Sequence, residues 1–163
     1  MHSMRVTKLI LTGLAMFTMV QPTRAAPSAG DARSEVIALA HRVVDAFNKG
    51  DMGTVASLMA AGDQSIIDEM PPFIWRGAGA TEAWLADVAK DADLNKDTDS
   101  FSVLGPPTFI RIEGDRAYAV FPDHFTYKRH GVRVNEDARW TFTAQNSPTG
   151  WHIVATSFSA GAH

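Results

Sequence analysis

The chain has 163 residues, of which 45% are hydrophobic and 20% charged, and it contains twelve glycines, eight prolines and no cysteine. This is the make-up of one globular domain with a sizeable core, and it excludes a disordered chain, a collagen-like repeat, thiol nucleophiles and cysteine-based metal sites. Beyond residue 25 twelve Lys and Arg residues stand against eighteen Asp and Glu, and an acidic domain without a basic stripe is not expected to bind nucleic acid.

Residues 1–25 have the pattern of a secretory signal peptide. Two basic residues precede an uncharged, mostly apolar run from Leu9 to Val20, and the small residues Thr23 and Ala25 favour cleavage after Ala25. That run is shorter than the ~20 residues that span a bilayer. We therefore expect a periplasmic or secreted protein that does not bind membranes once the signal is removed.

Three helices are predicted in the first part of the domain, which we place at residues 34–160 after a linker of small residues at 26–33. The first runs from Ser34 to Gly50, because its apolar residues recur at three- and four-residue spacing. Asp51 caps a second, shorter helix. A third extends from Thr81 to Lys90, and the acidic stretch from Asp91 to Ser100 is predicted to be a solvated connection.

The rest of the chain is predicted to form β-strands. Ser65–Met70 is a short strand closed by two prolines, and Phe73–Gly77 is extended. Four strands separated by turn signals follow, at residues 101–112, with a break at Gly105, and at 116–129, 132–144 and 151–159. The order predicts an α+β fold in which three N-terminal helices close a curved antiparallel sheet.

Five short motifs are spread along the domain: Phe47-Asn48-Lys49-Gly50-Asp51, Ile66-Ile67-Asp68-Glu69, Trp75-Arg76-Gly77 before a helix that contains Trp84, Trp140-Thr141-Phe142 and Gly150-Trp151-His152-Ile153. In their order and spacing they resemble the SnoaL-like family of the nuclear transport factor 2-like superfamily. The resemblance covers roughly residues 34 to 159 and implies a cone-shaped sheet closed by helices. The superfamily includes isomerases, cyclases, dehydratases, hydrolases and non-catalytic binders, so this fold does not specify an activity.

Asp68 is the first candidate catalytic residue. By position it is similar to the carboxylate that acts as the base in ketosteroid isomerases, but Val43 and Trp140 stand where those enzymes have a helix-one tyrosine and a second, proton-donating aspartate. Steroid isomerisation is therefore not expected. The alternative role of Asp68 is to cap a turn or helix.

Asp123 is the second candidate. Strand alternation places it in one row with Ala117, Ala119, Phe121, Phe125 and Tyr127. If this row faces the inside of the cone, burial raises the pKa of Asp123, as in many general acids and bases. The alternative is a bulge after Pro122 that turns Asp123 to solvent. With regular alternation, His124 points to the opposite face of the sheet from Asp123.

Aromatic residues are expected to line a cavity for an apolar or planar small molecule. The candidate ligand-binding residues are Trp75, Trp84, Phe121, Phe125, Tyr127, Trp140, Phe142 and Ser157. The histidines show no spacing typical of metal ligands, so neither a metal nor another cofactor is expected.

Two functions remain open from the sequence. One is an acid–base enzyme, an isomerase, cyclase or hydrolase, with Asp68 and Asp123 as its acids. The other is a non-catalytic domain that binds an apolar ligand or dimerises. A homodimer is expected through the convex sheet face, which carries Tyr118, Val120 and, on the neighbouring strand, Thr141 and Thr143.

Overall fold

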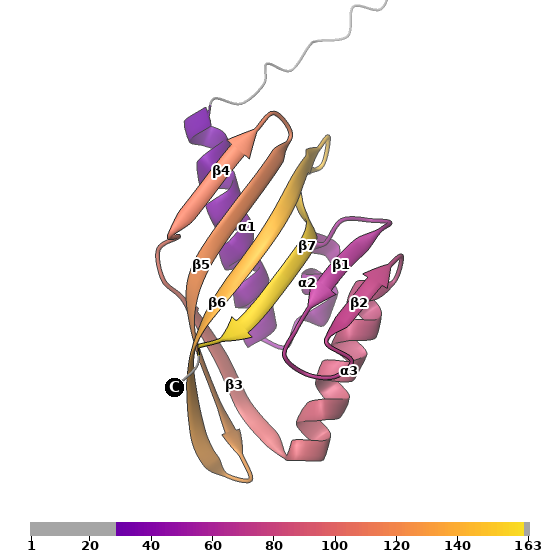
Figure 1. Ribbon diagram of the computed structural model, residues 1–163, viewed down its shortest axis with the longest axis vertical. Helices are drawn as coiled ribbons and strands as arrows, with labels where there is room; N and C mark the ends of the chain where they lie inside the picture. The colour runs from indigo at the N-terminus through magenta and orange to yellow at the C-terminus, as the bar shows by residue number, and fades with distance from the viewer. Residues whose placement is uncertain (1–28, 162–163) are drawn as a thin grey trace, which may run out of the picture.

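The computed structural model describes residues 29–161, so the signal-peptide prediction lies outside the described residues. The described chain forms three helices and seven strands, and the seven strands make up one curved sheet (Figure 1). The helices are α1 (Ala29–Asn48), α2 (Met52–Leu58) and α3 (Ala80–Asn95). The strands are β1 (Gln64–Ile67), β2 (Ile74–Gly77), β3 (Asp97–Leu104), β4 (Phe109–Glu113), β5 (Arg116–Arg129), β6 (Val132–Ser147) and β7 (Gly150–Ala160).

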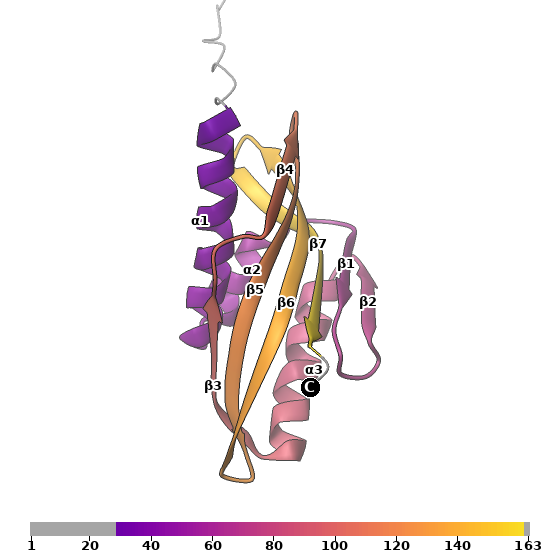
Figure 2. The same cartoon turned by 60° about the vertical axis from the view of Figure 1, so that its left-hand side comes forward.

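The sheet runs in the order β2-β1-β7-β6-β5-β3, and β4 pairs with β5 next to β3. All neighbouring strands are antiparallel except β1 and β7, which are parallel. The predicted α+β fold with a curved, unclosed sheet is confirmed. Figures 1 and 2 show α1 along one face of the sheet. The β5–β6 hairpin extends past the C-terminal end of α1 and lies beside α3.

Some predicted boundaries are wrong. The helix α1 begins at Ala29 rather than Ser34, so the end of the predicted linker is helical. The stretch from Asp91 to Ser100 is not a solvated connection: α3 continues to Asn95, and β3 begins at Asp97. Here tertiary pairing outweighs the polar composition, because β3 pairs with β5 and Arg129 binds Asp97 through two hydrogen bonds.

The strand predicted at residues 101–112 is two strands, β3 and β4, that pair with successive parts of β5. The break lies at Gly105, whose peptide N–H donates to the carbonyl of Pro122 at 2.9 Å. A Cβ atom at Gly105 would lie 2.9 Å from the Pro122 ring, so only glycine fits this close approach without movement.

The hydrophobic core lies between α1 and the half of the sheet that α1 covers. It joins Val36, Leu39 and Ala40 of α1 to Phe121 and Phe142 of β5 and β6, and all five side chains are fully buried. The rings of Phe121 and Phe142 stack with centroids 5.9 Å apart. Asp51 caps α2 as predicted, since its side chain accepts from the peptide N–H of Thr54 at 3.0 Å.

Within residues 29–161, none of the helices has the length and apolar character needed to cross a membrane.

Candidate functional site

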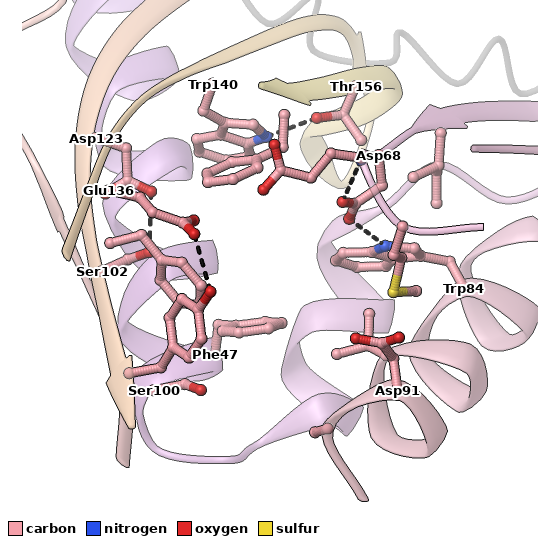
Figure 3. A pocket seen from close by; sticks show the side chains of 18 of the residues that line it. Phe47, Asp68, Trp84, Asp91, Ser100, Ser102, Asp123, Glu136, Trp140 and Thr156 are labelled. Atoms are coloured by element: carbon pink, nitrogen blue, oxygen red, sulfur yellow. Dashed lines mark hydrogen bonds between the residues drawn. The ribbon is translucent and has the colours of Figure 1, made fainter. Parts of the chain in front are cut away.

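A cavity of about 630 Å³ lies beyond the end of the core, between the far half of the sheet, the C-terminal end of α1, α2 and α3 (Figure 3). This volume suits a small-molecule site, for which about 300–1,000 Å³ is usual. Six aromatic residues line it: Phe47, Trp84, Phe125, Tyr127, Trp140 and Phe158. Carboxyl groups also line it, from Asp68, Glu69, Asp91, Asp97, Asp123 and Glu136.

Asp123 faces this cavity from β5. The pairing of β5 with β6 continues through Pro122 and Asp123 without a bulge, so the row alternation holds and the solvent-facing alternative is wrong. Asp123 is only 5% exposed, whereas His124 lies on the outer face and pairs with Asp137. Burial raises the pKa of Asp123, and hydrogen bonding by the Ser102 hydroxyl partly offsets this rise.

Two residues outside β5 hold Asp123 in position. Ser102 of β3 donates its hydroxyl to Asp123 Oδ2 at 2.9 Å. Asn48, at the end of α1, binds the backbone of Ser102 through both ends of its side-chain amide, at 2.8 Å each. The amide of Asn48 therefore fixes the strand that presents the hydroxyl to Asp123. Asn48 belongs to one of the motifs that carry the family resemblance.

Asp68 directly follows β1 and reaches the cavity from the opposite side. Its Oδ2 accepts from the indole N–H of Trp84 at 2.8 Å, and its Oδ1 accepts from the peptide N–H of Glu69 at 2.7 Å. Asp68 thus makes the backbone contact of the alternative capping role and also lines the cavity. Burial raises its pKa, and the hydrogen bond from Trp84 lowers it only in part.

Asp68 and Asp123 therefore share one cavity from opposite walls. Figure 3 shows Asp123 and Glu136 on one side of the open space and Asp68 with Trp84 on the other. For both aspartates the largest cause of the raised pKa is burial, not mutual repulsion. Burial therefore favours the protonated form of each carboxyl group at a pH above the usual range of an aspartate.

A hydrogen-bonded network lies on the cavity wall nearer the tip of the β5–β6 hairpin. The Tyr127 hydroxyl donates to Glu136 Oε1 at 2.9 Å, and the Arg129 guanidinium lies 5.2 Å from the centre of the Tyr127 ring. Arg129 donates to both carboxylate oxygens of Asp97, at 2.9 and 2.7 Å. Burial and Glu136 raise the pKa of Tyr127 to about 12, so its hydroxyl remains a neutral donor near neutral pH.

Half of the predicted ligand-binding residues line the cavity, namely Trp84, Phe125, Tyr127 and Trp140. Phe121 and Phe142 share the inner row but lie in the core, because that row is longer than the cavity and α1 covers its first half. Trp75 is buried and donates its indole N–H to Asp87 of α3 at 2.8 Å. These three rings stabilise the fold rather than line the cavity.

Ser157 also lies outside the cavity, and a β-bulge is the reason. On β7, Ile153 pairs with Ala144 and Ala155 pairs with Thr143, so Val154 is an extra residue between them. The extra residue reverses the alternation after Ile153. As a result, Thr156 and Phe158 line the cavity in place of the predicted Ser157.

Other cavity residues were missed by the sequence analysis. Glu136 stands on β6 in the same row as Trp140, four residues earlier, so extending that row would have found it. Asp91 lines the cavity from the part of α3 that was predicted as a connection. Within residues 29–161, no three His, Asp or Glu side chains are grouped so as to hold a metal ion.

Solved structures of other proteins share this fold. An NTF2-like superfamily protein from Salmonella enterica serovar Typhimurium LT2 matches with a TM-score of 0.70 and 23% identity over 83% of this chain and 95% of that one. A candidate dehydratase of the NTF2-like family from Streptomyces avermitilis matches with a TM-score of 0.68 and 17% identity over 83% and 100%. A ketosteroid isomerase-like protein from Erwinia carotovora gives 0.62 and 18% over 80% and 96%.

The chain therefore has the NTF2-like fold, as the sequence resemblance implied. No family model and no curated protein sequence matches the chain. The resemblance to the SnoaL-like family stays a prediction from the motifs. At these identities the structural similarity shows the fold but not the activity, which depends on the residues of the cavity.

Proposed function

We propose that this protein is an acid–base enzyme that moves protons on a small, largely apolar molecule held between Asp68 and Asp123. One observation carries the proposal: two carboxyl groups with pKa values raised by burial enter one aromatic cavity from opposite walls. A carboxyl group that titrates above its usual range serves as a base when ionised and as an acid when protonated.

The arrangement suits reactions in which a proton leaves one side of a substrate and another is delivered to the opposite side. Isomerisation, cyclisation and hydrolysis can each use such a pair. The aromatic lining would hold the substrate's apolar body and exclude water, which strengthens hydrogen bonds to the reacting atoms. Val43 and Trp140 line the cavity where a ketosteroid isomerase has its oxyanion donors, so a steroid enone is not the expected substrate.

Proton abstraction can be tested without knowing the product. A panel of cyclic ketones is incubated with the protein in D₂O, and loss of the C–H signals next to the carbonyl is followed by proton NMR. We expect exchange with at least one ketone, and a fall of about 100-fold or more in Asp68→Asn and in Asp123→Asn. Asp137→Asn, an exposed carboxylate on the outer face, is the control and should exchange normally.

The alternative function is a domain that binds an apolar ligand without reaction. It would be favoured if panel members bind, as saturation-transfer NMR would detect, while neither the wild-type protein nor the variants catalyse exchange. That result would contradict the enzyme proposal.

We also propose a homodimer through the outer face of the sheet. Tyr118 is 43% exposed there and lies edge-on to Phe109, which is 50% exposed, with ring centroids 6.0 Å apart. An exposed aromatic pair of this kind is typical of an interface. Light scattering should give twice the monomer mass at micromolar concentration, and Tyr118→Glu should give the monomer. A monomeric wild-type protein would contradict the proposal.

Export is proposed on the pattern of residues 1–25. In a Gram-negative host the periplasmic fraction should contain a product whose N-terminal sequence starts near Ala26. A full-length cytoplasmic product would contradict this proposal.

A further inference from the structure

The cavity is lined by many more acidic than basic side chains. Among the described residues that line it are six carboxyl groups and a single basic side chain, Arg129. Arg129 is already engaged, since it donates two hydrogen bonds to Asp97. The side-chain donors to the other carboxyl groups are uncharged: an indole for Asp68, a hydroxyl for Asp123 and a hydroxyl for Glu136. Neutral donors satisfy hydrogen bonds but do not balance charge.

One acceptor on the sheet wall lacks a well-formed hydrogen bond. Asp123 Oδ1 is fully buried and has no donor in good geometry among the described residues, although the peptide N–H of Val103 is near enough to lower the pKa of this carboxyl group slightly. Its cross-strand partner on β6 is Ala138, whose methyl side chain offers no hydrogen-bond donor to this oxygen. A buried acceptor without a partner is costly, so this oxygen marks a position where a ligand's donor would be stabilised.

Glu136 provides a second acceptor on the same wall. It precedes Ala138 by two residues in the inward-facing row on β6, and one of its oxygens accepts from Tyr127. The other oxygen has no hydrogen bond from the described residues. Figure 3 shows Asp123 and Glu136 on the same wall of the cavity, with the carboxyl group of Glu136 directed toward the open space.

Aromatic rings surround this pair of acceptors. Phe125 is the cross-strand partner of Glu136, and Trp140 lies two residues from Ala138 on the same strand. Aromatic faces attract organic cations, and they also pack against an apolar body. Carboxyl groups combined with aromatic rings form the environment that an ammonium group on a hydrophobic molecule requires.

We propose that the substrate or ligand of this cavity is a protonated amine with an apolar body, whose ammonium group donates hydrogen bonds to the carboxyl groups of Asp123 and Glu136. The inference rests on the proposed function only in taking this cavity as the substrate site. With an ammonium group bound, Asp123 stays ionised, and Asp68 on the opposite wall is left as the carboxyl group that holds and donates a proton.

The test compares three ligands of nearly equal size by isothermal titration calorimetry at neutral pH: naphthylethylamine, naphthylethanol and naphthylacetate. The amine should bind about tenfold or more tightly than the alcohol, because it adds charge-assisted hydrogen bonds, and the acid should bind weakest. Equal affinity for amine and alcohol, or tighter binding of the acid, would overturn the proposal.

Two neighbouring variants on β6 provide a matched comparison. Glu136→Gln and Asp137→Asn each remove one carboxylate, but Glu136 faces the cavity and Asp137 faces outward. The preference for the amine over the alcohol should fall several-fold in Glu136→Gln and stay unchanged in Asp137→Asn. If both variants change it by the same factor, the effect is one of overall charge and the proposed contact is wrong.

The ligand-binding test and the proton-exchange test distinguish failure of the proposed ligand class from failure of the proposed enzyme. Preferential amine binding without proton exchange would support the ligand class and contradict the proposed enzyme. Proton exchange on neutral ketones without any preference for the amine would support the enzyme and overturn the ligand class.

Discussion

The two halves of the β5–β6 inner face begin from the same alternation and end with opposite properties. In the first half the inward residues are small or apolar, such as Ala117, Ala119 and Phe121, and α1 packs against them in the core. In the second half the inward residues include Asp123 and Tyr127, and they face a cavity instead of a helix. One pair of strands thus supplies stability at one end and chemistry at the other.

The difference follows from where α1 ends. The helix covers the sheet up to Asn48, and the chain then turns away at Gly50 into α2. Beyond that point only side chains from α1's last turn, α2 and α3 reach toward the sheet, and they leave about 630 Å³ unfilled. Polar groups can persist there because they border the cavity and accept hydrogen bonds, as Asp68, Asp123 and Glu136 do.

The largest expected effect compares two phenylalanines on β5. Phe121→Ala empties part of the core and should reduce the free energy of unfolding by about 3–5 kcal/mol. Phe125→Ala should cost less than about 2 kcal/mol, because its ring is only partly buried and already borders the cavity. Urea denaturation followed by circular dichroism measures both. Equal losses would show that the cavity end is packed as tightly as the core.

The second prediction separates activity from stability at Asp123. In Asp123→Asn proton exchange should fall by about 100-fold, while the free energy of unfolding is kept or increased, because an incompletely bonded buried carboxylate is removed. Exchange NMR and urea denaturation on the same sample test this. A variant that loses stability and activity together would indicate that Asp123 is part of the structural core.

The third prediction concerns Asn48, which links the two halves. Asn48→Ala removes both hydrogen bonds to Ser102 and should cost about 1–3 kcal/mol of unfolding free energy. Because Ser102 holds Asp123, the pH dependence of proton exchange should also shift. A purely structural Asn48 would lower the stability and leave the pH profile of the remaining activity unchanged.

The elements and the inner row could be predicted from the sequence because both follow local patterns. Strand alternation along residues 116–129 correctly placed Asp123 inside and His124 outside. The three- and four-residue spacing of apolar residues correctly predicted a helix with one buried face, and in α1 that face includes Val36, Ala40 and Val43. These signals depend on the backbone geometry of one segment, so they need no knowledge of its neighbours.

The parts that failed depend on contacts between distant segments. Ser157 was expected in the cavity because the alternation of β7 was continued through Val154, and nothing local marks the bulge there. The boundary between core and cavity within the β5 row depends on where α1 lies over the sheet. The sequence predicts Asp91 in a solvated connection because the residues around it are mostly acidic and polar, whereas α3 continues through it to Asn95. Such features are set by packing across the sheet rather than by sequence period.

The fourth prediction concerns pH. The pKa of Asp123 is raised on folding above the 3.8 of an unperturbed aspartate. The folded state therefore binds more protons than the unfolded state over the range between those two pKa values, and wild-type stability falls as the pH rises through it. The difference in unfolding free energy between Asp123→Asn and the wild type should grow in favour of the variant over the same range. Urea midpoints at several pH values measure it, and a difference independent of pH would contradict the raised pKa.

The smallest effect is expected on the outer face of the same strands. His124 and Asp137 are bonded at 2.8 Å, but their side chains are 50% and 88% exposed. Exposed pairs contribute little because water and salt screen them, so His124→Ala should change the unfolding free energy by no more than about 0.5 kcal/mol. Proton exchange should also remain at the wild-type rate, because His124 points away from the cavity although it is the next residue after Asp123. If His124→Ala slowed exchange, the separation of the two faces would fail, and the outer pair would have to influence Asp123 through the charge of His124 or through the backbone of β5. Measuring His124→Ala beside Asp123→Asn therefore tests whether adjacent residues on one strand can differ completely in function because the strand alternates.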